Sequence, residues 1–138
     1  MISKVTVYSD GGSRGNPGPS AIGVLVCDEK GGSLKEHRET IGETTNNVAE
    51  YTAVIVGLEL AKTMGAKKVD YFVDSELVAR QLTGVYKIKA PHIRTLYDQV
   101  QAILPSFEKV TFTHVRREHP KLRIVDALVN QVLDEEGF

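Results

Sequence analysis

The sequence predicts an α/β fold in which a five-stranded mixed sheet is flanked by helices. Three strand-like segments come first and are separated only by turns, which is typical of an antiparallel meander. Two more strand-like segments then alternate with helix-like segments, which indicates parallel strands joined by helical crossovers. Because 138 residues suffice for a domain with its own core, we expect a single domain over residues 1–138.

The first three predicted strands are joined by short turns rich in proline and glycine. The first, over about residues 4–9, alternates apolar and polar side chains, and the second, over about residues 21–27, is almost entirely apolar. The third, over about residues 34–41, is rich in charged residues, which suits the edge of a sheet. The turns lie at Pro17–Pro19 and Lys30–Gly32.

A long helix is predicted next, and it is apolar on nearly every side. Thr45 or Asn46 can cap its beginning, and Gly65 can end it. A helix without a polar face is a buried one, so we place it in the core. The remaining elements, in order, are a strand over about residues 68–73, a short helix to about 82, a helix over about 91–104, a strand over about 109–115 and a helix over about 121–135.

The composition is typical of a soluble globular protein, with 41% hydrophobic and 25% charged residues. No apolar run approaches the roughly 20 residues that span a bilayer, and the first residues lack the pattern of a signal peptide. Cys27 is the only cysteine, so it cannot form an internal disulfide, and its apolar neighbours predict that it is buried. We therefore expect a cytoplasmic monomer without a membrane partner.

The net charge of −1 does not by itself indicate a nucleic-acid-binding protein. Positive residues nevertheless gather in two segments, one between Arg80 and Arg94 and the other between Lys109 and Arg123. From charge alone, two solvated faces are the simplest interpretation of these segments.

Four carboxylates occupy unusual positions. Asp10 ends the first predicted strand and is followed by glycines, which let a backbone approach a ligand closely. Glu50 lies on the apolar helix, Asp74 ends the fourth predicted strand, and Asp126 interrupts the apolar stripe of the last helix. Each has an ordinary explanation when taken alone, such as a turn residue, a first-turn glutamate, a helix cap or an exposed flank.

The expected topology favours a shared site, because one edge of the sheet could gather all four carboxylates. Oxygen ligands without neighbouring cysteine or histidine suit Mg²⁺ or Mn²⁺ rather than zinc. Crowded carboxylates repel one another, so such a site requires cations. Carboxylate clusters that hold two metal ions about 3.5–4 Å apart are a recurring solution for phosphodiester chemistry.

These residues resemble those of the type 1 ribonuclease H family. The matching segments come in the family's order, cover nearly the whole chain and are specific only when taken together. They are YSDGGSRGNPG at Tyr8–Gly18, TTNNVAEYTAVIVGLELA at Thr44–Ala61, FVDSELV at Phe72–Val78, and His119-Pro120 followed by VDALVN at Val125–Asn130. The resemblance implies the family's fold, which agrees with the mixed sheet predicted above.

The resemblance also implies a reaction, the hydrolysis of the RNA strand of an RNA–DNA hybrid to 5′-phosphate and 3′-hydroxyl ends. Asp10, Glu50, Asp74 and Asp126 match the family's catalytic and metal-binding carboxylates, which hold two Mg²⁺ or Mn²⁺ ions. By resemblance, Asp10 bridges both ions and Asp126 helps to hold the ion that activates water. Glu50 and Asp74 hold the ion that stabilises the leaving 3′-oxygen.

Substrate contacts are implied for several further residues. Gly11, Gly12, Ser13 and Glu76, together with Glu50, match positions that contact ribose 2′-hydroxyls, the groups by which a protein distinguishes RNA from DNA. Three further residues match the family segment that contacts the DNA strand: Thr45, Asn46 and Asn47. Asn16 matches a polar loop residue that lines the substrate groove.

The chain departs from the family pattern in three places that bear on turnover and affinity. Leu122 replaces a common polar residue before Asp126, so we expect weaker substrate contacts there. Arg116 stands where many bacterial members have a histidine that assists product release, and His119 is nearby. We expect slower turnover, or a substitute role in product release or phosphate contact for Arg116 or a neighbour. The stretch from Gly84 to Pro91 is too short for the family's basic protrusion, so we expect weak, salt-dependent affinity.

Two alternatives stay open. One is a non-catalytic nucleic-acid-binding module of the same fold, against which the intact set of four acids argues. The other is a nuclease of the same fold that also acts on double-stranded RNA, which the segments at Gly11–Ser13 and Thr44–Asn47 exclude only weakly.

Overall fold

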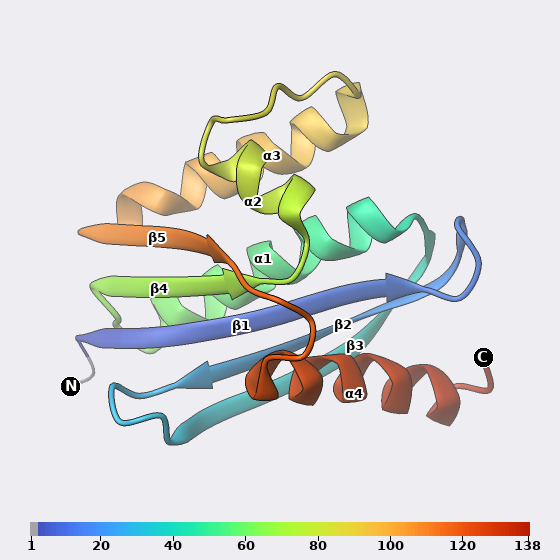
Figure 1. Cartoon of the computed structure of the whole chain (residues 1–138), viewed down its shortest axis with the longest axis horizontal. Helices are drawn as coiled ribbons and strands as arrows, with labels where there is room; N and C mark the ends of the chain where they lie inside the picture. The colour runs from blue at the N-terminus through green and yellow to red at the C-terminus, as the bar shows by residue number, and fades with distance from the viewer. Residues whose placement is uncertain (1–2) are drawn as a thin grey trace.

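The strands of the computed structural model, which describes residues 3–138, form one twisted sheet with helices on both faces (Figure 1). In chain order the strands are β1 (Lys4–Ser13), β2 (Gly18–Cys27), β3 (Ser33–Thr44), β4 (Lys68–Val73) and β5 (Lys109–His114). The helices are α1 (Asn46–Thr63), α2 (Glu76–Leu82), α3 (Pro91–Ile103), a 3-10 turn at Leu104–Ser106 and α4 (Pro120–Glu135).

The strand order across the sheet is β3-β2-β1-β4-β5, which confirms the predicted mixed topology. β1, β2 and β3 form an antiparallel meander, and β4 and β5 are added in parallel beside β1. The charged strand β3 lies at one edge and the apolar strand β2 lies inside the sheet, as their compositions predict.

The core is divided between the two faces of the sheet. On one face, alternate residues of β1, β2 and β4 pack with α1, α2 and α3, and the buried side chains include Val5, Val7 and Tyr51. On the other face, α4 covers β2 and part of β1 through Leu122 and Val125. The two helical layers therefore approach the central strand β1 from opposite sides.

The predicted end of the first strand is wrong, because β1 continues through the glycines to Ser13. Asp10 to Ser13 stay paired with β2, with Asp10 opposite Gly23 and Ser13 opposite Ser20. Asp10 thus lies within a strand rather than before a loop. The loop between β1 and β2 contains only residues 14–17.

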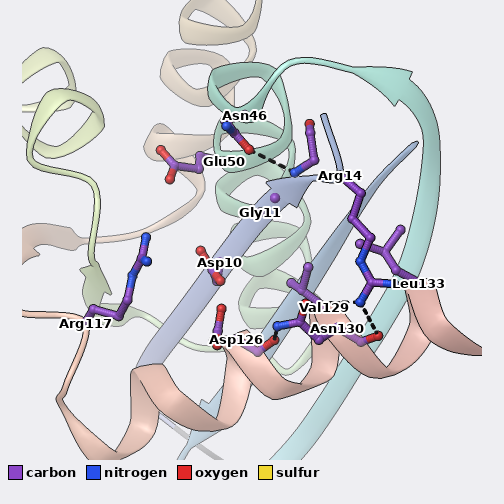
Figure 2. Close-up of a pocket in the computed structure, with 12 residues that line it drawn as sticks. Asp10, Gly11, Arg14, Asn46, Glu50, Arg117, Asp126, Val129, Asn130 and Leu133 are labelled. Atoms are coloured by element: carbon purple, nitrogen blue, oxygen red, sulfur yellow. Dashed lines mark hydrogen bonds between the residues drawn. The ribbon is translucent and has the colours of Figure 1, made fainter. Parts of the chain in front are cut away.

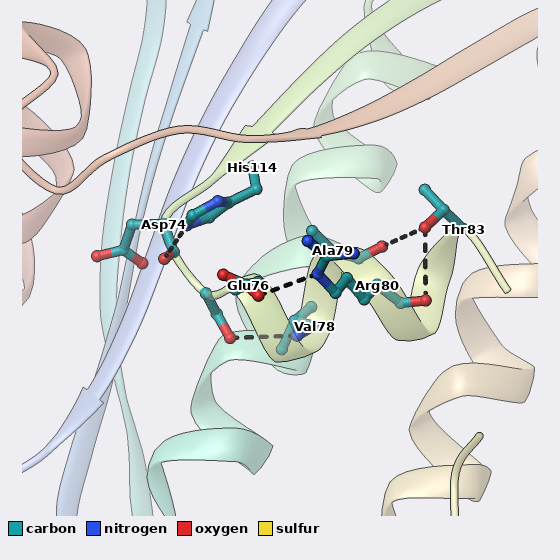
Figure 3. Close-up of polar contacts among 8 residues, drawn as sticks. Asp74, Glu76, Val78, Ala79, Arg80, Thr83 and His114 are labelled. Carbon is teal, nitrogen blue, oxygen red and sulfur yellow. Dashed lines mark hydrogen bonds and ion pairs between the residues drawn. The ribbon is translucent and has the colours of Figure 1, made fainter. Parts of the chain in front are cut away.

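Side-chain caps begin the helices next to this part of the sheet. The Val48 N–H donates to Thr45 Oγ1 at 3.3 Å, so Thr45 is the predicted cap of α1, and Gly65 follows its end with a φ of +79°. Ser75, rather than Asp74, caps α2 by accepting from the Val78 N–H at 3.2 Å (Figure 3). The carboxylate of Asp74 is consequently not used as a cap.

Two further observations concern membrane spans and the cysteine. No helix within residues 3–138 is both long and apolar enough to cross a membrane. Cys27 is buried, as its apolar surroundings predict.

Candidate active site

A polar pocket of about 300 Å³ opens beside the later part of β1, with Asp10 in its wall (Figure 2). Glu50 of α1 and Asp126 of α4 enter the same pocket from the two helical layers. Asp74, at the end of β4, lies with Asp10 and Glu50 in an adjoining small pocket. The structure therefore brings the four predicted carboxylates together from four separate elements.

Close packing of α1 on β1 positions Glu50. A Cβ atom on Gly11 would lie 2.2 Å from the backbone carbonyl carbon of Ala49 and 2.5 Å from the backbone nitrogen of Glu50. Only glycine permits this approach, so Gly11 brings the first turns of α1 against the strand beside Asp10. Gly11 was expected to let the backbone approach a ligand. On the face to which its Cβ would point, it lets helix α1 approach instead.

Close packing of α4 on β2 positions Asp126 in the same manner. A Cβ atom on Gly23, the residue opposite Asp10, would lie 2.5 Å from the backbone oxygen of Val125. Gly23 thus brings α4 against the second face of the sheet at the level of Asp10. Gly11 follows Asp10 on β1, and Gly23 lies opposite it on β2. Together they let α1 and α4 approach closely enough to place Glu50 and Asp126 near Asp10.

Asp74 is held at the start of the connection between β4 and α2. Its backbone oxygen lies 3.1 Å from His114 Nε2, which ties this connection to β5 (Figure 3). Its carboxylate lies 3.4 Å from the Nε of Arg117, in the segment between β5 and α4. The Asp74 side chain is 9% exposed whereas that of Arg117 is 79% exposed, so the guanidinium covers a nearly buried carboxylate from solvent.

Burial and mutual repulsion disfavour the charged forms of these acids. Burial raises the pKa of Asp10 to about 8, and the negative charges of Asp74, Glu50 and Asp126 add to the increase. Burial also raises the pKa of Glu50 to about 7, although a hydrogen bond with Ser75 lowers it in part. The site therefore holds more acid groups than it can keep ionised without positive charge.

A divalent cation fits this chemistry. Asp10, Glu50 and Asp74 each offer a carboxylate oxygen within 4.8 Å of the others, and all three donors are hard oxygen ligands. Asp126 lies beyond this trio, on the α4 side of Asp10, where a hydrogen bond between the two acids also raises the pKa of Asp10. The arrangement is suited to metal ions on both sides of Asp10.

The loop between β1 and β2 is tied to the start of α1 by three of the predicted substrate residues. Asn46 Oδ1 accepts from the Ser13 N–H at 2.9 Å, and Asn16 Oδ1 accepts from the Asn46 N–H at 3.0 Å. Ser13 and Asn46 line the pocket with Gly11 and Gly12, whereas Asn16 supports them from outside it. Thr45 and Asn47 flank Asn46 as the cap and a first-turn residue of α1.

Other predicted residues lie outside the pocket. Glu76 forms an ion pair with Arg80 at 3.0 Å on α2 (Figure 3). The Nδ1 of His119 accepts from the Lys121 N–H at 3.1 Å at the start of α4, and its ring packs against Tyr8. Arg116 is exposed and does not line the pocket, whereas its neighbour Arg117 does (Figure 2).

Sequence reasoning missed three contributors to this site. In the sequence, Arg117 is one of several positive residues between Lys109 and Arg123. Nothing there indicates that its side chain, and not that of Arg116, lines the pocket. Arg14 and Asn130 close the far side of the pocket, where Arg14 Nη2 lies 3.3 Å from Asn130 Oδ1 (Figure 2). Asn130 was within a matched segment, and its spacing of one turn from Asp126 could have indicated a shared helix face.

Comparison with known proteins places this geometry in a family. Residues 8–132 match the family described as reverse transcriptase-like. The chain is 40% identical over 132 residues to ribonuclease HI of Halobacterium salinarum, covering 96% of this chain and 65% of that protein. It is 34% identical to ribonuclease H of Hydrogenovibrio crunogenus, covering 97% of this chain and 98% of the relative.

A solved structure agrees closely with the fold. LC11-RNase H1, from compost and in complex with an RNA/DNA hybrid, is 43% identical and superposes with a TM-score of 0.90. The match covers 96% of this chain and 98% of that one, whereas the chain spans less than two thirds of the halobacterial relative. The match over most of the chain and the relative of nearly equal length show that this protein belongs to the ribonuclease H family.

Proposed function

We propose that this chain is a metal-dependent endonuclease that hydrolyses the RNA strand of RNA–DNA hybrids, leaving 5′-phosphate and 3′-hydroxyl ends. The observation that carries the proposal is the convergence of four carboxylates from β1, α1, the end of β4 and α4. The hybrid in the LC11-RNase H1 complex supports the choice of substrate. A binding module without catalysis has no use for such mutually repelling acids.

The donor set supports two Mg²⁺ or Mn²⁺ ions as the cofactor. Asp10 would contact both, Glu50 and Asp74 would share one with it, and Asp126 would share the other. When bound, such ions polarise phosphate oxygens and lower the pKa of the attacking water. The raised pKa values of Asp10 and Glu50 support this proposal, because a bound cation would offset both the burial and the repulsion that raise them.

The chain's own groups would orient the substrate around this centre. Gly12 has no side chain, so a sugar-phosphate backbone can approach the strand closely at the pocket floor. The hydrogen bond from Ser13 to Asn46 fixes the pocket rim before substrate arrives, which reduces the ordering that binding requires. Arg117 is exposed beside Asp74 and is available to a phosphate oxygen.

Cleavage of one labelled sequence in four forms tests the proposal: RNA–DNA, RNA–RNA, DNA–DNA and single-stranded RNA. Each form is incubated with Mg²⁺, with Mn²⁺ and with a chelator. Metal-dependent cutting of the RNA strand in the hybrid is the expected result, and the RNA–RNA reaction measures whether double-stranded RNA is a further substrate. Hybrid binding without cutting in any reaction would instead support the non-catalytic module. Action as a cytoplasmic monomer stays a prediction.

A further inference from the structure

A row of three lysines crosses the sheet at the end away from the carboxylates. Lys4 of β1 pairs in register with Lys68 of β4, which pairs with Lys109 of β5. Residues in register on neighbouring parallel strands point to the same face, so the three ammonium groups share one face across about 10 Å of sheet. With Asp70 they line an open hollow of about 190 Å³.

This hollow lies on the face of the sheet that carries the active site. Lys4 and Asp10 are six positions apart on β1, and alternation places both on the face that α4 covers. Six strand residues span about 20 Å. Figure 1 shows α4 beside the later part of β1 and not over the beginnings of β1, β4 and β5, so no helix within residues 3–138 covers this end of the face.

The hollow has an excess of positive charge. The two oxygens of Asp70 are already engaged, one by Lys4 Nζ at 3.3 Å and the other by the Thr111 hydroxyl at 2.9 Å. Within residues 3–138, neither Lys68 nor Lys109 forms an ion pair. Like charges in neighbouring positions on adjacent strands destabilise a sheet, so an anion in the hollow would relieve a repulsion that the free protein carries.

We propose that this hollow binds a backbone phosphate of the nucleic acid whose scissile bond lies in the active site; the inference rests on the proposed function. Lysine ammonium groups bind phosphate as point charges. Phosphates follow one another about every 3.4 Å along each strand of a duplex, so 20 Å corresponds to about six phosphates. A hybrid engaged at the carboxylates reaches Lys68 and Lys109 only when its flank is at least that long.

The test compares two hybrids that share one cleavable ribonucleotide block. The short hybrid extends about four base pairs, or roughly 14 Å, to either side of the scissile bond, and the long one extends about 12 base pairs. The variant is Lys68→Gln/Lys109→Gln, which keeps most of each aliphatic stem. The control is Lys35→Gln/Lys62→Gln, which removes two exposed charges, one on β3 and one at the end of α1, away from the hollow. Far-UV circular dichroism verifies that both are folded.

The expected result is a change confined to the long hybrid. The test variant raises KM for the long hybrid several-fold at about 50 mM salt and makes the slope of log KM against log salt shallower by about 0.9, the loss of one neutralised phosphate. The control variant and Lys68→Arg/Lys109→Arg keep the wild-type KM for the long hybrid. The value of kcat does not change, because the lysines do not contact the reacting atoms.

Two different failures are distinguishable. If wild-type protein cleaves both hybrids but the Lys68→Gln/Lys109→Gln variant shows wild-type KM and salt slope on the long one, this proposal is overturned and the proposed function stands. If wild-type protein cleaves neither hybrid with Mg²⁺ or Mn²⁺, the proposed function is overturned and this proposal with it.

Discussion

At the scale of single residues, the protonation of Asp10 links the metal site to stability. Its pKa is about 8 in the folded chain, compared with about 3.9 for an unperturbed aspartate. Between these values the folded state binds more protons than the unfolded state, so stability falls as the pH rises from about 4 to about 8. In the metal-free protein, Asp10 therefore destabilises the folded state most under the alkaline conditions in which the site is most fully charged.

We predict that Asp10→Asn raises the thermal midpoint of the chelator-treated protein at a pH of about 8.5, because it removes a buried charge. At this chain length each 1 kcal/mol corresponds to about 4 °C, and the difference shrinks toward a pH of about 4. Thermal unfolding followed by circular dichroism measures both values. Equal midpoints at alkaline pH would show that burial and the neighbouring acids do not disfavour the charged form of Asp10 in the folded chain.

Arg117 and Arg116 provide a matched pair for the role of positive charge beside the site. Arg117→Ala is expected to lower kcat/KM about tenfold or more, since a hydrogen bond to a charged group contributes about 1.5–3 kcal/mol. Arg116 does not line the pocket, so Arg116→Ala is expected to change kcat/KM by no more than about twofold. A larger loss for Arg116→Ala would contradict this prediction. It would indicate that Arg116, which occupies the family's product-release position, supplies the positive charge beside the site.

At the scale of elements, the site depends on how closely two helices approach the sheet. α1 contacts β1 at Gly11 and α4 contacts β2 at Gly23, and these positions flank Asp10 within the sheet. Interiors are close-packed, so a side chain in either place displaces the backbone of a helix. The separation of the carboxylates is thus set by backbone contacts rather than by loops.

We predict that Gly11→Ala and Gly23→Ala each destabilise the protein by about 1–3 kcal/mol, because the new methyl group meets helix backbone. Each should also weaken Mg²⁺ activation, since Glu50 or Asp126 moves away from Asp10. Gly12→Ala is the control for stability, because its Cβ would meet only Val129 Cγ1 at 3.6 Å. Urea unfolding measures the free energies, and a wild-type value for Gly11→Ala would contradict the packing argument.

At the scale of the whole molecule, the order and type of the elements follow from local patterns. Alternation in β1, the apolar run of β2, the cap at Thr45 and Pro91 at the start of α3 all act within a few residues. The length of β1 was not predictable from such patterns. Gly11 and Gly12 resemble a loop locally, and only pairing with β2 and packing under α1 keep them in the strand.

The four acids of the site were predictable from the sequence, but the positions of the neighbouring charged residues were not all predictable. β1 and β4 pair in parallel as far as Tyr8 and Phe72, and Asp10 and Asp74 each follow two residues later, which is why the two acids could be paired from the sequence. The choice of Arg117 over Arg116 depends on how the segment between β5 and α4 lies beside Asp74, at the end of a distant strand. Local sequence does not contain this information, whereas the Glu76–Arg80 ion pair joins residues four apart on α2 and could have been predicted from helix spacing.

The account as a whole rests on four carboxylates that act together on the RNA strand of a hybrid. The most direct measurement is the Mg²⁺-dependent cleavage rate for the wild type and for Asp10→Asn, Glu50→Gln, Asp74→Asn and Asp126→Asn. Asp98→Asn, an exposed acid paired with Arg94 on α3, is the matched control.

We expect each of the four variants to lose at least about a hundredfold in rate, because metal-ion charge stabilisation supplies several kcal/mol. The control should stay close to the wild type, and products should carry 5′-phosphate and 3′-hydroxyl ends. Wild-type cleavage by any of the four variants, or undiminished cleavage in a chelator, would contradict the account.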